Sequence, residues 1–154
     1  MTTIAPTTNG RVIALAHYAA RALLEGVLTR HGITFEQNVT LRAVFDGGAP
    51  VERERLVADV IGSLKADESV ARTAIDRLTT AELIERDPAE ASRIRLTDAG
   101  RRLFETTTAE TAEISARLYA DIPAEDLAVA GRVLKLVTER ANAELARTRG
   151  TGPA

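Results

Sequence analysis

The stretch from residue 67 to residue 104 constrains the fold most, because the spacing of its apolar residues changes twice. Apolar residues recur at helical spacing from 70 to 78, whereas residues 93–96 (Arg-Ile-Arg-Leu) alternate basic and apolar side chains as a half-buried strand does. Residues 83–86 (Leu-Ile-Glu-Arg) are also compatible with a strand. Thr97 then suits the N-cap of a new helix. The stretch predicts a helix, a small two-stranded ribbon and a second helix.

This order is typical of a winged helix-turn-helix, in which the helix reads a DNA groove and the ribbon tip reaches the backbone or minor groove. Apolar periodicity predicts further helices over 11–30, 35–45 and 51–62, and again over 101–121 and 123–147. Thr34 and Gln37 form a capping box before the second of these, and Asp67 is placed to cap the helix of the central stretch.

We therefore expect a mainly α fold with a small β-ribbon, organised as a winged helix-turn-helix with terminal dimerisation helices. The prediction treats 1–154 as a single domain. It assigns 34–100 to the winged helix-turn-helix, 10–30 and 101–147 to the dimerisation helices, and 1–9 and 148–154 to disordered ends. The alternative for the terminal helices is a bundle that packs within one chain.

Composition supports a helical protein that gains buried area by dimerising. Only 3% of the residues are aromatic, so the core has to be built from Leu, Val, Ile and Ala, and Ala-rich helices bury little area each. The absence of cysteine excludes disulfides and thiolate metal sites, and two histidines make a zinc site unexpected, so we predict no metal and no cofactor. We find no apolar run of bilayer-spanning length and no secretory leader, and we expect a cytoplasmic protein.

The charge balance neither favours nor excludes a nucleic-acid partner. The formal net charge is −2, and residues 65–102 contain eight basic and eight acidic side chains. DNA binding would therefore depend on arginines gathered on one face rather than on bulk attraction.

Three motifs in order resemble the multiple-antibiotic-resistance regulator (MarR) family. They are Asp76-Arg77-Leu78, Leu83-Ile84-Glu85-Arg86 and the run from Leu96 to Leu103 that begins Leu-Thr-Asp-Ala-Gly. In that family a recognition helix ending in D-R-L leads to G-L-V-x-R, a wing and L-T-x-x-G. The chain departs from the family pattern at Glu82, where the family usually has Gly, and in a wing several residues shorter than usual. The resemblance implies a homodimer that places two recognition helices about one DNA turn apart on a near-palindromic operator.

The candidate DNA-binding residues lie in the recognition helix and the wing. They are Ser69, Arg72, Thr73 and Arg77 in the helix, with Arg86 and Arg93 in the wing. Arg72 has the chemistry to pair with a guanine edge, and Ser69 or Thr73 to reach a base or phosphate. The alternative is that the helix arginines pair with Glu68 or Asp76 on a solvated face.

The resemblance also implies an effector pocket, for which the first helix offers Arg11, His17, Tyr18 and Arg21. His17 and Arg21 are four residues apart and share a face, so they suit a small aromatic or anionic molecule. A His17 that is hydrogen-bonded within the dimer interface is the plainer alternative. His31 follows a helix C-terminus, where we expect a capping role.

The sequence does not predict an enzyme, since neither histidine lies in a nucleophile motif and no phosphate-binding glycine loop occurs. The prediction is a sequence-specific DNA-binding transcriptional regulator, a homodimeric repressor released by a small anionic or phenolic effector. The alternative is a non-DNA-binding protein-interaction module on the same scaffold.

Overall fold

The computed structural model describes residues 7–150, so the predictions for 1–6 and 151–154 lie outside the described residues. The chain forms two compact units, the first ending at Ser115 and the second beginning at Ala116. The assignment of the whole chain to one domain stays a prediction.

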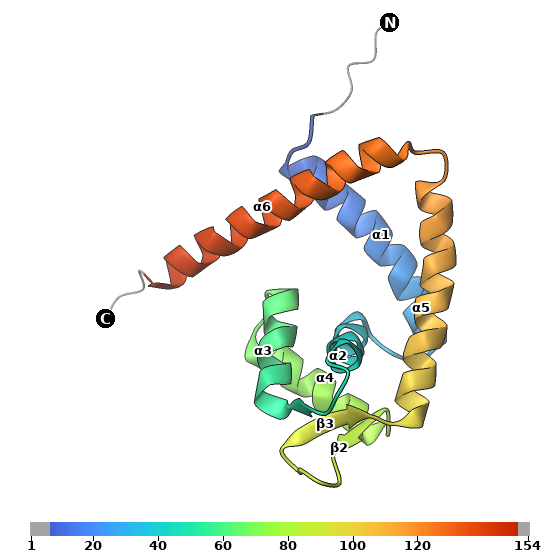
Figure 1. Cartoon of the computed structure of the whole chain (residues 1–154), viewed down its shortest axis with the longest axis vertical. Coiled ribbons are helices and arrows are strands. Elements are labelled where there is room, and N and C mark those ends of the chain that lie inside the picture. The colour runs from blue at the N-terminus through green and yellow to red at the C-terminus, as the bar shows by residue number, and fades with distance from the viewer. Residues whose placement is uncertain (1–6, 151–154) are drawn as a thin grey trace, which may run out of the picture. The chain divides into compact units, whose positions relative to one another are not determined.

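The first unit is a helical core with a small sheet at one end (Figure 1). Its elements in order are α1 (Gly10–Arg30), α2 (Phe35–Asp46), β1 (Val51–Glu52), α3 (Arg53–Leu64), α4 (Glu68–Thr80), β2 (Ile84–Arg86), β3 (Arg93–Leu96) and most of α5 (Asp98–Tyr119). Helices α2, α3 and α4 pack on one another, and the buried side chains of Leu41, Leu56, Leu78, Ile84 and Phe104 belong to one core cluster. The mainly α fold with a small β element is confirmed.

Local sequence signals set most of the helix ends. The capping box predicted at Thr34 is present, with the Thr34 side chain accepting from Gln37 N and the Gln37 side chain accepting from Thr34 N. Helix α1 is capped by Asn9 and is followed by Gly32 at a φ of +72°. Asp67 occupies the N-cap of α4 but makes no side-chain capping hydrogen bond, so that part of the prediction is wrong.

The sheet has three strands rather than the predicted two, in the order β1-β3-β2. Val51 and Glu52 were expected to start the third helix, but they pair antiparallel with Ile94 and Arg93, and α3 begins at Arg53. The reason is a contact between segments distant in sequence. One edge of β3 pairs with β2 and the other pairs with the segment after Pro50, and the local sequence pattern does not show the second pairing. The paired residues Glu85 and Arg95 on β2 and β3 form a cross-strand ion pair of 2.7 Å.

The turn between α4 and β2 is bound to the start of α5 by Thr97 and Gly100. Thr97 donates its hydroxyl to the Glu82 carbonyl at 2.7 Å, and its Oγ1 accepts from Gly100 N at 3.0 Å. A Cβ built on Gly100 would lie 1.9 Å from the Leu83 carbonyl oxygen, so only glycine fits there. Glu82, where the MarR pattern has glycine, adopts a φ of +56°, a left-handed conformation that glycine prefers.

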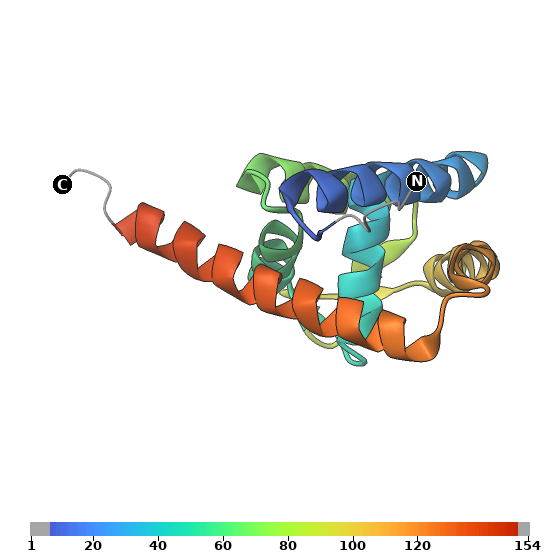
Figure 2. The same ribbon diagram turned by 90° about the horizontal axis from the view of Figure 1, so that it is seen from above.

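The second unit consists of the end of α5, a turn and α6 (Ala124–Gly150), which Figure 2 shows as one continuous helix. Helix α6 continues three residues beyond 147, where the sequence predicted the helix to end. Most of its length is exposed, including the apolar side chains of Val129, Val133, Leu134, Leu136, Val137 and Leu145.

Helix α1 shows that the expectation of no apolar run of bilayer-spanning length is wrong. Its 21 residues include an 18-residue stretch with a mean hydropathy of 1.3. By length and composition alone, this helix could cross a membrane. At its C-terminal end Val27 and Leu28 are buried, while Val12, Leu15, Tyr18 and Leu23 are exposed. The apolar side chains of α1 therefore pack into the core at its C-terminal end, whereas several of those along the rest of the helix are exposed to solvent.

We expect Gly100→Ala to destabilise the protein by about 1–3 kcal/mol or more, because the new methyl group overlaps the Leu83 carbonyl and α5 has to shift. Denaturant unfolding monitored by circular dichroism measures the change. Gly62→Ala in α3 is the matched control: nothing lies within 4 Å of its Cβ position, so it should be neutral or stabilise by up to about 1 kcal/mol. Equal effects of the two substitutions would contradict the steric explanation.

Candidate nucleic-acid interface

Helix α4 buries one stripe of side chains and leaves two polar stripes exposed. Ala71, Ala74, Ile75 and Leu78 face the core and are buried. The first exposed stripe carries Glu68, Arg72 and Asp76, and the second carries Ser69, Thr73 and Arg77. All four helix residues predicted to contact DNA therefore lie outside the core, but they divide between two stripes with different surroundings.

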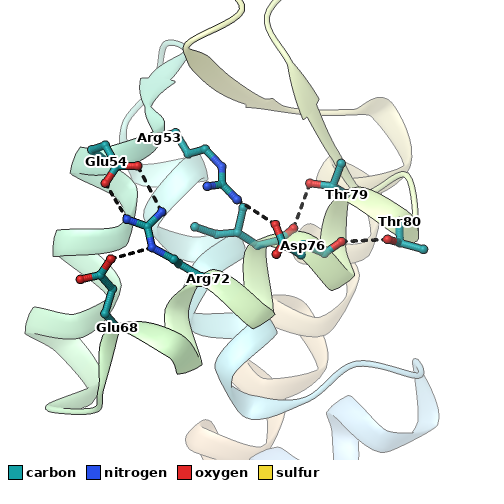
Figure 3. Close-up of polar contacts among 8 residues, drawn as sticks. Arg53, Glu54, Glu68, Arg72, Asp76, Thr79 and Thr80 are labelled. Atoms are coloured by element: carbon teal, nitrogen blue, oxygen red, sulfur yellow. Dashed lines mark hydrogen bonds and ion pairs between the residues drawn. The ribbon is translucent and has the colours of Figure 1, made fainter.

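Residues of the first stripe form ion pairs with the first turn of α3, as Figure 3 shows. Arg72 Nη2 lies 2.8 Å from Glu54 Oε2 and Arg72 Nη1 lies 3.2 Å from Glu54 Oε1. Arg72 Nε lies 2.6 Å from Glu68 Oε1 within α4. The alternative that Arg72 pairs with Glu68 is thus observed in the free chain, with a second acidic partner that the sequence analysis missed.

A second bridge of opposite polarity joins the same two helices. Arg53 Nη2 lies 2.7 Å from Asp76 Oδ1, so α3 supplies the cation here and the carboxylate at Arg72 (Figure 3). Arg53 and Glu54 are adjacent in α3, and their partners Asp76 and Arg72 lie one helical turn apart on α4. The two bridges neutralise the side of α4 that faces α3.

The environment of this cluster favours its charged forms. The hydrogen bond from Arg72 holds the pKa of the Glu54 carboxyl below its usual value, and hydrogen bonds from Glu54 and Glu68 raise the pKa of the Arg72 guanidinium. Both shifts come chiefly from side-chain hydrogen bonds. Arg72 is therefore an ion-paired cation in the free protein, with all three guanidinium nitrogens donating to carboxylates.

The second stripe is not neutralised. Ser69, Thr73 and Arg77 line a hollow of about 370 Å³ whose other wall is the N-terminus of α2, including Thr34, Glu36 and Gln37. The Glu36 carboxylate lies 3.6 Å from Arg21 rather than pairing with Arg77. Arg77 is exposed and has no ion-pair partner among residues 7–150; Asp76 pairs with Arg53, and Glu68 pairs with Arg72. For Arg77 the predicted pairing with either acid is not observed.

In the wing, the two candidate arginines differ in the same way. Arg93 Nε lies 3.2 Å from Glu52 Oε1 and 2.5 Å from Glu90 Oε2, so its guanidinium is already engaged. Arg86 is exposed and has no ion pair within the described part of the chain. The turn between β2 and β3 is ordered by Asp87, whose Oδ1 accepts from the backbone N–H of Ala89 and Glu90.

The four α1 residues predicted to hold an effector are not gathered into one cavity. Arg11, His17 and Tyr18 are exposed, with the rings of His17 and Tyr18 in edge contact at 5.9 Å. Arg21 is half-buried, pairs with Glu25 at 2.8 Å and lies 4.2 Å above the Phe35 ring.

A hollow of about 400 Å³ in the first unit instead involves α1, α2 and α5. Leu24, Phe35 and Arg42 line one side, and Thr107 and Thr111 line the other. The sequence offered one signal for it, the unusual run of three threonines from 106 to 108 in a helix, but no signal for Arg42.

His31 has the predicted place at the C-terminus of α1, where its backbone N–H caps the helix. Its ring also lies 2.8 Å from Glu110 Oε1 of α5, and Arg30 Nη2 lies 2.7 Å from Glu110 Oε2. These two contacts hold the pKa of the Glu110 carboxyl below its usual value. They join the end of α1 to α5.

No family model and no curated protein matches the sequence. Solved structures do match. A MarR-family transcriptional regulator from Rhodococcus sp. RHA1 has a TM-score of 0.69 at 18% identity, over 84% of this chain and 92% of that chain. The MepR–DNA complex of S. aureus has a TM-score of 0.66 at 18% identity, over 86% and 96%.

A third match is Bordetella bronchiseptica BpsR, in a structure concerned with regulation of its DNA binding by 6-hydroxynicotinic acid. Its TM-score is 0.62 at 25% identity, over 83% of this chain and 97% of that chain. These similarities establish the fold, and they confirm at that level the family resemblance that the three motifs indicated.

Proposed function

We propose that this chain, which has the fold of the MarR family of transcriptional regulators, is a homodimeric, sequence-specific DNA-binding repressor. The observation that carries the proposal is the second exposed stripe of α4. It places Ser69, Thr73 and Arg77 along one edge, and its cation has no ion-pair partner among the described residues. Hydroxyl donors one and two helical turns from an arginine suit contacts to phosphates and base edges in the major groove.

The wing adds a second contact in this proposal. Arg86 lies at the end of β2 and, like Arg77, is exposed and unpaired within residues 7–150. We assign it a phosphate contact. Arg72 and Arg93 remain proposed DNA contacts, but each has to leave its carboxylate partners to make one.

The neutralised arginines favour one alternative, a protein-interaction module that keeps the scaffold without effective DNA readout. Arg72, Arg93 and Arg95 are all paired with glutamates, so the surface of α4 and the wing is less basic than its arginine content indicates. The DNA-binding measurement below separates the two functions.

A gel-shift or fluorescence-anisotropy titration against the DNA upstream of the protein's own coding region should show binding that weakens steeply with salt. Arg77→Ala should cost about 1–3 kcal/mol of binding free energy if Arg77 reads a base, or lower the salt slope by about 1 if it contacts a phosphate. Arg140→Ala on α6, which makes the same change of charge in the second unit, is the control and should leave binding unchanged. The absence of a shift at low salt would favour the protein-interaction alternative.

The exposed apolar faces of the terminal helices support the proposed dimerisation. Helix α1 exposes Leu15 and Tyr18, and α6 separately exposes Val133 and Val137 with other aliphatic side chains. Contiguous apolar patches of this kind mark an interaction surface. A partner copy that covers them places two α4 helices on the two halves of a near-palindromic operator.

Light scattering coupled to size exclusion should give twice the mass of one chain. Leu134→Glu on the apolar face of α6 should shift the protein toward monomer, because a carboxylate would be buried in the interface. Asn142→Glu, an exposed polar position of the same helix, is the control and should leave the dimer intact. A wild-type protein that is monomeric at micromolar concentration would contradict the dimer.

Release from DNA by a small anionic or phenolic molecule completes the proposal. The hollow among α1, α2 and α5 pairs an aromatic wall, Phe35, with a cation, Arg42, which fits an aromatic acid. Ligand binding there would shift the population toward a spacing of recognition helices that misfits DNA. The α1 candidates Arg11, His17, Tyr18 and Arg21 stay predictions.

Thermal unfolding in a panel of hydroxybenzoic and hydroxynicotinic acids should identify a stabilising ligand, with a gain of about 2.7 kcal/mol at a hundred times its Kd. Arg42→Ala should abolish this gain, whereas Arg11→Ala should leave it if the α1 residues are not involved. A melting temperature that is unchanged across the panel would contradict the pocket assignment.

A further inference from the structure

The guanidinium of Arg72 has both of its paired-donor edges occupied in the free protein. An arginine offers two such edges, one formed by Nη1 and Nη2 and the other by Nε and the neighbouring Nη. Glu54 accepts from both Nη atoms, at 3.2 and 2.8 Å, and Glu68 accepts from Nε at 2.6 Å. No edge is left that can form two parallel hydrogen bonds to a guanine or a phosphate.

We propose that Glu54 and Glu68 act as internal competitors of DNA at Arg72, so that this arginine binds DNA only where a two-point acceptor replaces a carboxylate. The inference rests on the DNA-binding function proposed above. In this inference, Glu54 and Glu68 lower the affinity of the protein for DNA that lacks its binding site.

The exchange is stereochemically selective. A carboxylate presents two oxygens in one plane, and the groups of DNA that match this are the O6/N7 edge of guanine and the two free oxygens of a phosphate. A single acceptor, such as thymine O4, cannot replace the two hydrogen bonds that Arg72 would give up. Where neither a guanine edge nor a phosphate lies within reach in this geometry, Arg72 therefore stays on its glutamates.

The position of the cluster allows the exchange. The side chains of Glu54 and Glu68 are 72% and 59% exposed, and that of Arg72 is 36% exposed, so DNA has access to both partners. Ion pairs at such exposed positions are weak in water. The competitors can thus be displaced without disturbing the core beneath α4.

A double-mutant cycle on a scrambled duplex tests the competition, using wild type, Glu54→Gln, Arg72→Gln and the double variant. Simple effects of charge add at each step and cancel around the cycle, so a remaining coupling reports the release of Arg72. We expect Arg72→Gln to cost about fivefold more affinity in the Glu54→Gln background than in wild type at about 0.15 M salt. That factor corresponds to one phosphate contact, and the salt slope should steepen by about 0.9 when Glu54 is replaced.

Asp67→Asn is the matched control. Asp67 lies one residue before Glu68 at the start of α4, carries the same charge and makes no ion pair within residues 7–150. Its cycle with Arg72→Gln should show no coupling. A coupling of zero for Glu54, or one of opposite sign in which Glu54 assists Arg72, overturns the competition.

Two further measurements keep the outcomes apart. Without DNA, an NMR titration should show that Arg72→Gln raises the pKa of the Glu54 carboxyl, since the Arg72 hydrogen bond is the main cause of its lowering; an unchanged Glu54 pKa overturns the competition. Melting temperatures of the four proteins should agree within a few degrees, because all the substituted side chains are at the surface.

If wild type binds neither the scrambled duplex nor its upstream DNA at low salt, the proposed function fails together with this inference. If it binds but shows no coupling, the inference fails alone.

Discussion

The burial of one side of α4 is the constraint on which the surface chemistry of this protein depends. Ala71, Ile75 and Leu78 have to meet the α2–α3 core and the sheet, which fixes the rotation of the helix about its axis. Once that rotation is set, Arg72 faces the first turn of α3 and Arg77 faces the N-terminus of α2. Two arginines five residues apart on one helix therefore have different surroundings, and the chemistry of each follows from its neighbours.

The same packing explains why Thr97 and Gly100 occur together. The core requires β2 to begin directly after α4, so the chain turns at Glu82 with a positive φ and brings the Leu83 carbonyl against the start of α5. Thr97 then bonds to the Glu82 carbonyl and to Gly100 N, and Gly100 leaves room for the Leu83 carbonyl. The Leu-Thr-x-x-Gly pattern is thus a joint between the sheet and α5. Glu82 keeps the turn despite the side chain that makes a positive φ costly.

Features that depend on neighbours in sequence were predictable, and features that depend on distant contacts were not. The helical period, the Thr34 capping box and the alternation of residues 93–96 gave the helices and two strands with ends close to those observed. Strand β1 was missed because two residues after Pro50 carry no periodicity, and only β3 makes them a strand. For the same reason sequence reasoning named Glu68 as a partner of Arg72, four residues away, but not Glu54, which lies eighteen residues away and accepts two hydrogen bonds from Arg72.

The distribution of paired and unpaired arginines also accounts for how a chain of net charge −2 is compatible with a DNA-binding role. Affinity for DNA of any sequence depends on the cations available to phosphates rather than on the total count of cations. Ion pairs withdraw Arg72, Arg93 and Arg95 from that set, while Arg77 and Arg86 remain available in α4 and β2. Such a surface would attract arbitrary DNA weakly, so the proposed binding would have to come from the fit of a few donors to particular base edges and phosphates. In the competition proposed for Arg72, acidic residues near α4 contribute to selectivity because they lower the affinity for every site at which that fit is absent.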